Sequence, residues 1–95
     1  MSFFVYIIYS PSKDRFYVGL TENYKRRISE HNSGFFKNSS TKVARDWITF
    51  ILLPCKSRSQ ALKIESHIKK AKSRRFIENL RKYPEIAEKL LSKYK

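Results

Sequence analysis

The stretch over residues 3–9 constrains the fold more than any other part of the sequence. Every side chain in it is apolar or aromatic, which is typical of a strand that is buried on both faces. Residues 10–14 have the composition of a turn, and residues 15–19 then read as a second strand. The two strands predict an antiparallel hairpin in which the first strand is central in its sheet and covered on both sides.

One more helix and one more strand complete the expected sheet. Thr21 can cap a helix over residues 22–32. A polar loop over residues 35–45 follows this helix. Residues 47–53 then form a third strand, which Pro54 ends.

The C-terminal part of the chain predicts three helices. Ser57 or Ser59 opens the first of them, which runs to about residue 73 and carries an apolar stripe. A short helix over residues 74–82 and a last helix begun by Pro84 follow. The stripe on the first helix consists of Ala61, Leu62, Ile64, Ile68 and Ala71.

The expected order β-β-α-β-α-α-α gives an α+β fold with a small three-stranded antiparallel sheet and helices packed against it. A chain of 95 residues has room for one domain, over residues 1–95. Cys55 is the single cysteine, so we expect no internal disulfide and a reducing, cytoplasmic setting. The apolar run at residues 3–9 is too short to span a membrane and lacks the flanks of a signal peptide.

The chain is strongly basic, with 21 Lys and Arg against 8 Asp and Glu and a formal net charge of +13. This excess indicates a polyanionic partner, nucleic acid first and an anionic membrane surface second. Residues 56–95 carry 13 of the basic and 4 of the acidic side chains, so most of the excess lies on the expected C-terminal helices. The competing interpretation is a soluble protein that is merely basic.

Two tyrosines on the hairpin and two residues of the following helix form an unusual combination. Arg27 and His31 are four residues apart, so they project from one face of that helix. Arg27 could brace a phosphate, and His31 could hydrogen-bond a tyrosine hydroxyl or move its proton. A phenol such as Tyr6 or Tyr17 has an ordinary pKa near 10, so it needs a cation or a metal nearby to act as a base. The alternative is a pair of core tyrosines beside a solvated basic helix face.

Glu65 interrupts the apolar stripe of the first C-terminal helix, four residues after Ala61 and three before Ile68. A carboxylate directed at a core or cleft needs a cation, a metal or hydrogen bonds close by. One inward carboxylate suits Mg²⁺, which keeps most of its waters and uses one or two carboxylates plus substrate phosphate. The alternative is a carboxylate at the rim, paired with Lys69 at i+4.

Taken together, these residues resemble the GIY-YIG nuclease domain, and above all its small single-domain bacterial members. The resemblance runs over residues 3–72, roughly three quarters of the chain, and leaves residues 73–95 as basic C-terminal helices. Val5 and Val18 stand where the family name has Gly and Ile, and both suit a strand. The matching positions are Val5-Tyr6-Ile7, Tyr17-Val18-Gly19, Arg27, His31 and Glu65.

The resemblance implies a role for each matching position. Tyr6 would be the general base that activates the attacking water, and Tyr17 would line the site and hydrogen-bond the phosphate or the water. Arg27 would stabilise the phosphate, and His31 would support deprotonation of the tyrosine. Glu65 would bind the divalent metal, Mg²⁺ or Mn²⁺. In addition, Asn79 stands about where many members have an asparagine after the glutamate.

The implied activity is that of a metal-dependent endonuclease, which hydrolyses phosphodiester bonds in structured or damaged DNA. DNA is expected rather than RNA, and strong sequence specificity is not expected because no second DNA-binding domain is recognisable. The alternative is a catalytically silent basic module that binds nucleic acid with the same fold. The side chains expected to hold the nucleic-acid backbone are Lys25, Arg26, Lys69, Lys70, Lys72, Arg74 and Arg75.

Overall fold

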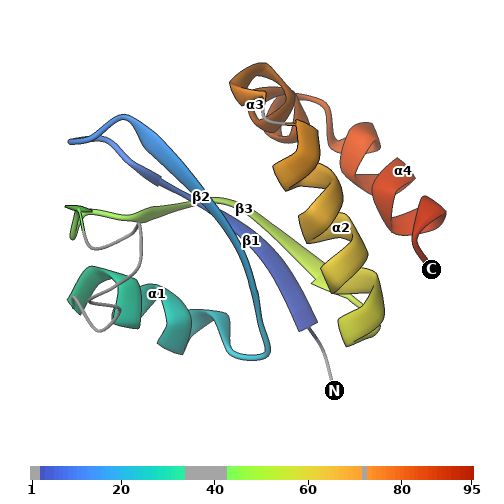
Figure 1. The fold of residues 1–95 in the computed structure, drawn as a ribbon, viewed down its shortest axis with the longest axis horizontal. Helices are drawn as coiled ribbons and strands as arrows, with labels where there is room; N and C mark the ends of the chain where they lie inside the picture. Colours follow the sequence, from blue (N-terminus) through green and yellow to red (C-terminus); the bar gives the residue numbers. More distant parts are fainter. Residues whose placement is uncertain (1–2, 34–42, 72) are drawn as a thin grey trace.

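The structure, a computed structural model, describes residues 3–33, 43–71 and 73–95. Its centre is one antiparallel sheet with the strand order β2-β1-β3 (Figure 1). The sheet confirms the hairpin and the central position of its first strand. Its strands are β1 (Phe3–Ser10), β2 (Arg15–Thr21) and β3 (Ile48–Cys55).

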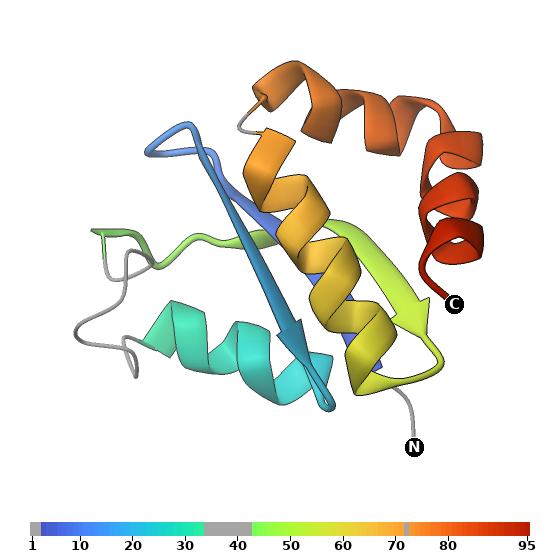
Figure 2. The same ribbon diagram turned by 45° about the vertical axis from the view of Figure 1, so that its right-hand side comes forward.

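Helices lie on both sides of this sheet, so the α+β class and the predicted order of elements are confirmed. Figures 1 and 2 show α1 on one side of the sheet and α2 on the other, with α3 and α4 beyond α2. None of the described helices is long and apolar enough to cross a membrane. The helices are α1 (Tyr24–Ser33), α2 (Arg58–Ala71), α3 (Arg74–Lys82) and α4 (Pro84–Lys93).

The continuous apolar run of β1 is explained by these two layers of helix. Because successive side chains of a strand point to opposite faces, Val5 and Ile7 join the larger core cluster, which includes residues of α2. Tyr6 and Ile8 join a second cluster with Trp47, against which residues of α1 pack. The four β1 side chains are at most 2% exposed, so residues 5–8 of this strand are enclosed on both faces.

The C-terminal helices begin at capping signals and complete the larger core cluster. Ser73 is the N-cap of α3, and its Oγ accepts a hydrogen bond from the backbone N–H of Phe76 at 3.1 Å. Pro84 occupies the first turn of α4, as predicted. Leu80 of α3 and Leu90 of α4 are buried in the cluster, so the basic helices are part of the fold.

Two local predictions differ from the structure. The N-cap of α1 is Asn23, whose Oδ1 accepts from the backbone N–H of Arg26 at 3.1 Å. Thr21 pairs with Phe4 in the sheet instead. Strand β3 also continues through Pro54 to its end, because an edge strand tolerates a residue without an N–H.

The apolar stripe of α2 is narrower than predicted. Leu62 is 39% exposed and Ala71 is also exposed, whereas Gln60 is 4% exposed. The Gln60 amide is satisfied at both ends, since Oε1 accepts from the N–H of Lys56 at 2.7 Å and Nε2 donates to the carbonyl of Leu91 at 3.0 Å. Most of the predicted loop over residues 35–45 lies outside the described residues.

Candidate active site

One pocket of about 260 Å³ brings together the five residues that the sequence singled out for chemistry. They come from four elements, namely both strands of the hairpin and the helices α1 and α2. The grouping confirms that the predicted residues share one place in the fold. The pocket is lined by Tyr6, Tyr17, Gly19, Leu20, Arg27, His31 and Glu65.

Gly19 lets the phenol of Tyr6 lie across the hairpin. The two residues are direct partners in the antiparallel register of β1 and β2. A Cβ atom on Gly19 would lie 2.5 Å from the Tyr6 hydroxyl oxygen and 2.6 Å from its Cζ. No side chain larger than hydrogen therefore fits there without displacing the ring. The sequence analysis missed this function of Gly19, although the hairpin register carries the signal for it.

Tyr6 and His31 form a buried polar pair. The Tyr6 hydroxyl lies 2.9 Å from His31 Nε2, and the two side chains are 2% and 3% exposed. Tyr17 packs beside both of them, with ring centroids 6.3 Å from Tyr6 and 5.0 Å from His31. Tyr24 of α1 packs on Tyr6 from another side, with a centroid distance of 5.4 Å. The hydroxyl–imidazole contact predicted for His31 is therefore present.

Burial keeps both members of this pair neutral. Burial, together with the nearby charge of Arg27, lowers the pKa of His31 from its ordinary value of 6.5 to about 4. Burial also raises the pKa of Tyr6, and Tyr17 adds to the rise. Arg27 acts in the opposite direction on Tyr6 but does not outweigh burial. Arg27 thus favours the phenolate, but the protein's own groups together leave the phenol of Tyr6 neutral at ordinary pH.

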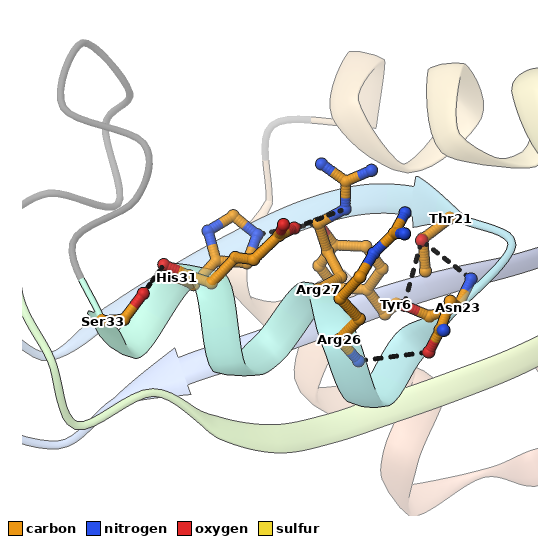
Figure 3. Close-up of polar contacts among 8 residues, drawn as sticks. Tyr6, Thr21, Asn23, Arg26, Arg27, His31 and Ser33 are labelled. Carbon is orange, nitrogen blue, oxygen red and sulfur yellow. Dashed lines mark hydrogen bonds and ion pairs between the residues drawn. The ribbon is translucent and has the colours of Figure 1, made fainter.

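Arg27 projects from α1 and lines the pocket. Figure 3 shows its guanidinium group and the His31 ring projecting from the same side of the helix, as their spacing predicts. The Arg27 Nε atom is 3.9 Å from Glu30 Oε1, and the two side chains are 31% and 23% exposed. A guanidinium that is half-buried and reaches a pocket beside a phenol is well placed to contact an anion.

Glu65 supplies the carboxylate of the pocket. Its side chain is 18% exposed, and its Oε2 lies 3.7 Å from Lys69 Nζ. The i+4 pair with Lys69 is formed, as one interpretation predicts, and the carboxylate also lines the pocket. In the part of the chain that the structure describes, no three His, Cys, Asp or Glu side chains are grouped to hold a metal ion. The donor set thus fits a hard cation that keeps most of its waters.

The basic residues predicted to hold nucleic acid fall into different places. Lys25, Lys70 and Arg75 are exposed on α1, α2 and α3 respectively. Arg74 is also exposed, and its Nη2 lies 2.6 Å from Asp14 Oδ1 while its guanidinium stacks over the Phe16 ring. Arg26 is exposed on α1, Lys69 is exposed on α2, and Lys72 lies outside the described residues.

Asn79 is not brought to the pocket. It lies in α3, and its backbone carbonyl accepts a hydrogen bond from the N–H of Tyr83 at 2.8 Å. This bond closes the end of the helix. The pocket lining contains the other five predicted residues and does not contain Asn79.

Comparison with known families agrees with this geometry. The family model described as the GIY-YIG catalytic domain matches residues 2–81 of the chain. The match extends beyond the predicted limit at residue 72 and takes in most of α3. No curated protein and no solved structure matches the chain. Because the family model covers most of the chain, this protein belongs to the GIY-YIG family of nucleases.

Proposed function

We propose that this protein is a divalent-metal-dependent endonuclease that hydrolyses phosphodiester bonds in DNA. The observation that carries the proposal is the hydrogen bond between Tyr6 and a neutral His31, in a pocket that also holds Arg27 and Glu65. The buried hydrogen bond contributes to stability in a nuclease and in a binding module alike. The grouping of this pair with a guanidinium and a carboxylate in one pocket supports a nuclease, because hydrolysis needs an acceptor for the proton of water and groups that hold the phosphate.

The proposed base is the Tyr6–His31 pair rather than a free phenolate. At neutral pH His31 is uncharged, so Nε2 can accept the Tyr6 proton when Nδ1 carries the ring hydrogen. The phenol oxygen takes a proton from the attacking water as its own proton passes to Nε2. The resulting hydroxide forms a bond to phosphorus while the P–O bond to the leaving oxygen breaks, and the leaving oxygen takes a proton from solvent. The pair ends as neutral phenol and imidazolium. The raised pKa of Tyr6 makes this relay necessary, since a free phenolate is scarce.

Arg27 and Tyr17 are proposed to bind the phosphate. The guanidinium donates in a fork that matches two phosphate oxygens, and its charge offsets the negative charge that grows in the pentacoordinate transition state. The Tyr17 hydroxyl is half-buried at the same pocket and can donate to a phosphate oxygen or orient the water. These two groups hold the reacting phosphorus next to the Tyr6 oxygen.

Glu65 is the proposed metal ligand, for Mg²⁺ or Mn²⁺. When bound, such a cation supplies Lewis acidity to the phosphate oxygens and stabilises the leaving oxygen. A single carboxylate within a solvent-reached pocket fits this use, because Mg²⁺ takes its other ligands from water and substrate. Lys69 Nζ, 3.7 Å from Glu65 Oε2, partly balances the charge of this carboxylate.

The proposed substrate is structured or damaged DNA of the kind that arises in repair and recombination, in the cytoplasm of a cell. The net charge of +13 supports a polyanion. The exposed basic side chains of α1, α2 and α3 would contact the backbone, and phosphate contacts carry little sequence information. DNA is proposed over RNA.

The test is a cleavage assay on purified full-length protein. The substrates are labelled duplex, nicked, branched and single-stranded DNA, with RNA of the same sequences, in Mg²⁺, in Mn²⁺ and in EDTA. We expect cleavage of at least one DNA substrate with either metal and none in EDTA. Tight binding without cleavage of any substrate would instead support the silent nucleic-acid-binding module.

A further inference from the structure

A second pocket, of about 380 Å³, adjoins the candidate active site. The two pockets share Leu20 and Arg27 in their linings. The second pocket lies where β2 ends, and it also takes in the first residue of α2, Arg58. Figures 1 and 2 show the first turns of α1 and α2 near each other at this end of the sheet. A DNA strand that passes through the candidate active site can therefore continue directly into the second pocket.

Three arginines line this second pocket. Arg26 and Arg27 come from α1, and Figure 3 shows their guanidinium groups projecting to the same side of the helix. Arg58 joins them from the opposite side of the sheet. Three guanidinium groups from two helices are not brought together by the core, because Arg26 and Arg58 are exposed. Their convergence suits an anion with several oxygens, which guanidinium groups contact in a fork.

The pocket keeps its positive charge in the folded protein. Among the described residues, neither Arg26 nor Arg58 lies within ion-pair distance of a carboxylate, whereas Arg74 is held by Asp14. Glu22 lines the pocket as its one acidic residue, so the arginines remain in excess. A group that is charged and not neutralised by its own protein gains most from an incoming phosphate.

We propose that this arginine pocket binds the phosphate next to the one that is cleaved, on the same DNA strand. The inference rests on the proposed nuclease function, and it adds a second subsite to it. Arg27 contacts both phosphates because it lines both pockets. Arg58 and Arg26 contact the flanking phosphate and do not contact the cleaved one. Arg58 thereby sets which phosphodiester bond lies over Tyr6, as a binding residue that reads the backbone rather than the bases.

The test measures binding in EDTA, so that it does not depend on cleavage. A fluorescent DNA oligonucleotide is prepared as a series in which one phosphate at a time is replaced by an uncharged methylphosphonate. Affinities of the full-length wild type, of Arg58→Gln and of the control Lys56→Gln are measured by anisotropy. Lys56 is exposed, two residues from Arg58, and lines neither pocket, so its substitution removes the same charge nearby.

We expect one methylphosphonate position at which wild-type affinity falls about tenfold, on the scale of one charge-assisted contact. Arg58→Gln should bind unmodified DNA about tenfold more weakly, and its penalty at that position should be smaller than that of the wild type, because only Arg26 and Arg27 still contact this phosphate. Lys56→Gln should keep the full penalty there. If every position costs Arg58→Gln as much as it costs the wild type, the inference is overturned.

Two further outcomes separate this inference from the function on which it rests. Should the protein cleave DNA while the Arg58→Gln and wild-type profiles remain parallel, the subsite fails and the nuclease stands. Should the profiles differ as expected while no substrate is cleaved, the subsite stands and the nuclease fails. Titration with inorganic phosphate is the remaining arm. Suppose that the NMR signals of the Arg58 guanidinium shift and saturate as free phosphate is added, while the DNA profiles of Arg58→Gln and wild type stay parallel. The pocket would then bind a free anion, and the assignment to the DNA backbone would be overturned.

Discussion

The Tyr6 hydroxyl oxygen lies 2.9 Å from Nε2 of His31, and both side chains are almost completely buried. Neither group is charged at neutral pH, because burial lowers the pKa of the imidazole to about 4 and raises that of the phenol. The neutral pair can therefore take up one proton from water, and neither group has to be deprotonated first. This arrangement makes the contribution of each group separable by substitution.

Replacing Tyr6 with Phe should reduce the cleavage rate at least a hundredfold, the usual contribution of proton transfer. The ring and its packing remain, so the loss of unfolding free energy should stay near 1–2 kcal/mol, the cost of leaving His31 Nε2 without its partner. Single-turnover kinetics and urea unfolding measure the two effects. Tyr24→Phe is the matched control, since its hydroxyl bonds Thr49 Oγ1 at 2.7 Å outside the pocket. Equal rates for both variants would contradict the base assignment.

His31 should make the protein less stable in acid. The unfolded chain takes up a proton at His31 near pH 6.5, whereas the folded protein resists protonation until about pH 4. The free energy of unfolding should therefore fall as the pH drops through this interval, by about 3 kcal/mol from this group. Urea unfolding at a series of pH values, compared with His31→Gln, isolates the effect. Parallel curves for the two proteins would show that His31 is not the responsible group.

Replacing Gly19 with Ala should destabilise the protein by about 1–3 kcal/mol, the usual cost of overpacking. The added methyl group meets the Tyr6 ring at 2.5–2.6 Å, so the ring must move and cleavage should fall with it. The double variant Tyr6→Ala with Gly19→Ala removes the clash. In the Tyr6→Ala background, Gly19→Ala should therefore destabilise the protein less than it does in the wild type, and activity should not return. Thermal unfolding of the wild type, the two single variants and the double variant measures this coupling. Additive effects would contradict the contact.

Replacing Glu65 with Gln should abolish metal-dependent cleavage and leave DNA affinity nearly unchanged. One carboxylate carries the proposed metal contact, whereas many basic side chains share the binding. Isothermal titration with Mn²⁺ gives a readout besides activity, and the variant should show no binding at the pocket. Glu88→Gln on the exposed face of α4 is the control. Full activity of the Glu65 variant, or of the wild type in EDTA, would contradict the prediction.

DNA binding should weaken steeply with salt and change little with sequence. Six or more phosphate contacts imply a loss of roughly a thousandfold between about 50 and 200 mM salt. Anisotropy titrations on two unrelated duplex sequences measure both effects. A flat salt dependence would contradict a backbone interface, and a large difference between the sequences would point to base contacts.

Much of the fold and of the site follows from local sequence. The two-sided burial of β1 was predictable from its unbroken apolar run, and the shared direction of Arg27 and His31 from their spacing. Glu65 was identifiable because a carboxylate interrupts an apolar stripe. These features depend on strand alternation and helix periodicity, which a chain carries before it folds.

Other features arise only when the elements assemble. Thr21 and Asn23 are both good caps, and sheet pairing with Phe4 decides between them. The balance between burial and Arg27 that sets the pKa of Tyr6 depends on how far the ring is enclosed. The approach of Arg58 to α1 depends on where two helices on opposite faces of the sheet begin. None of these is encoded within a single turn of helix or strand.

The division of the pocket between elements has a consequence for how the protein is made. Tyr6, Tyr17, Arg27 and His31 lie within one continuous stretch, from β1 to α1, and only Glu65 comes from α2. During translation the phenols and the imidazole leave the ribosome before the proposed metal ligand exists. A polypeptide that stops short of α2 lacks Glu65 and therefore carries an incomplete pocket, so under the proposed mechanism the site is assembled only after α2 has been made.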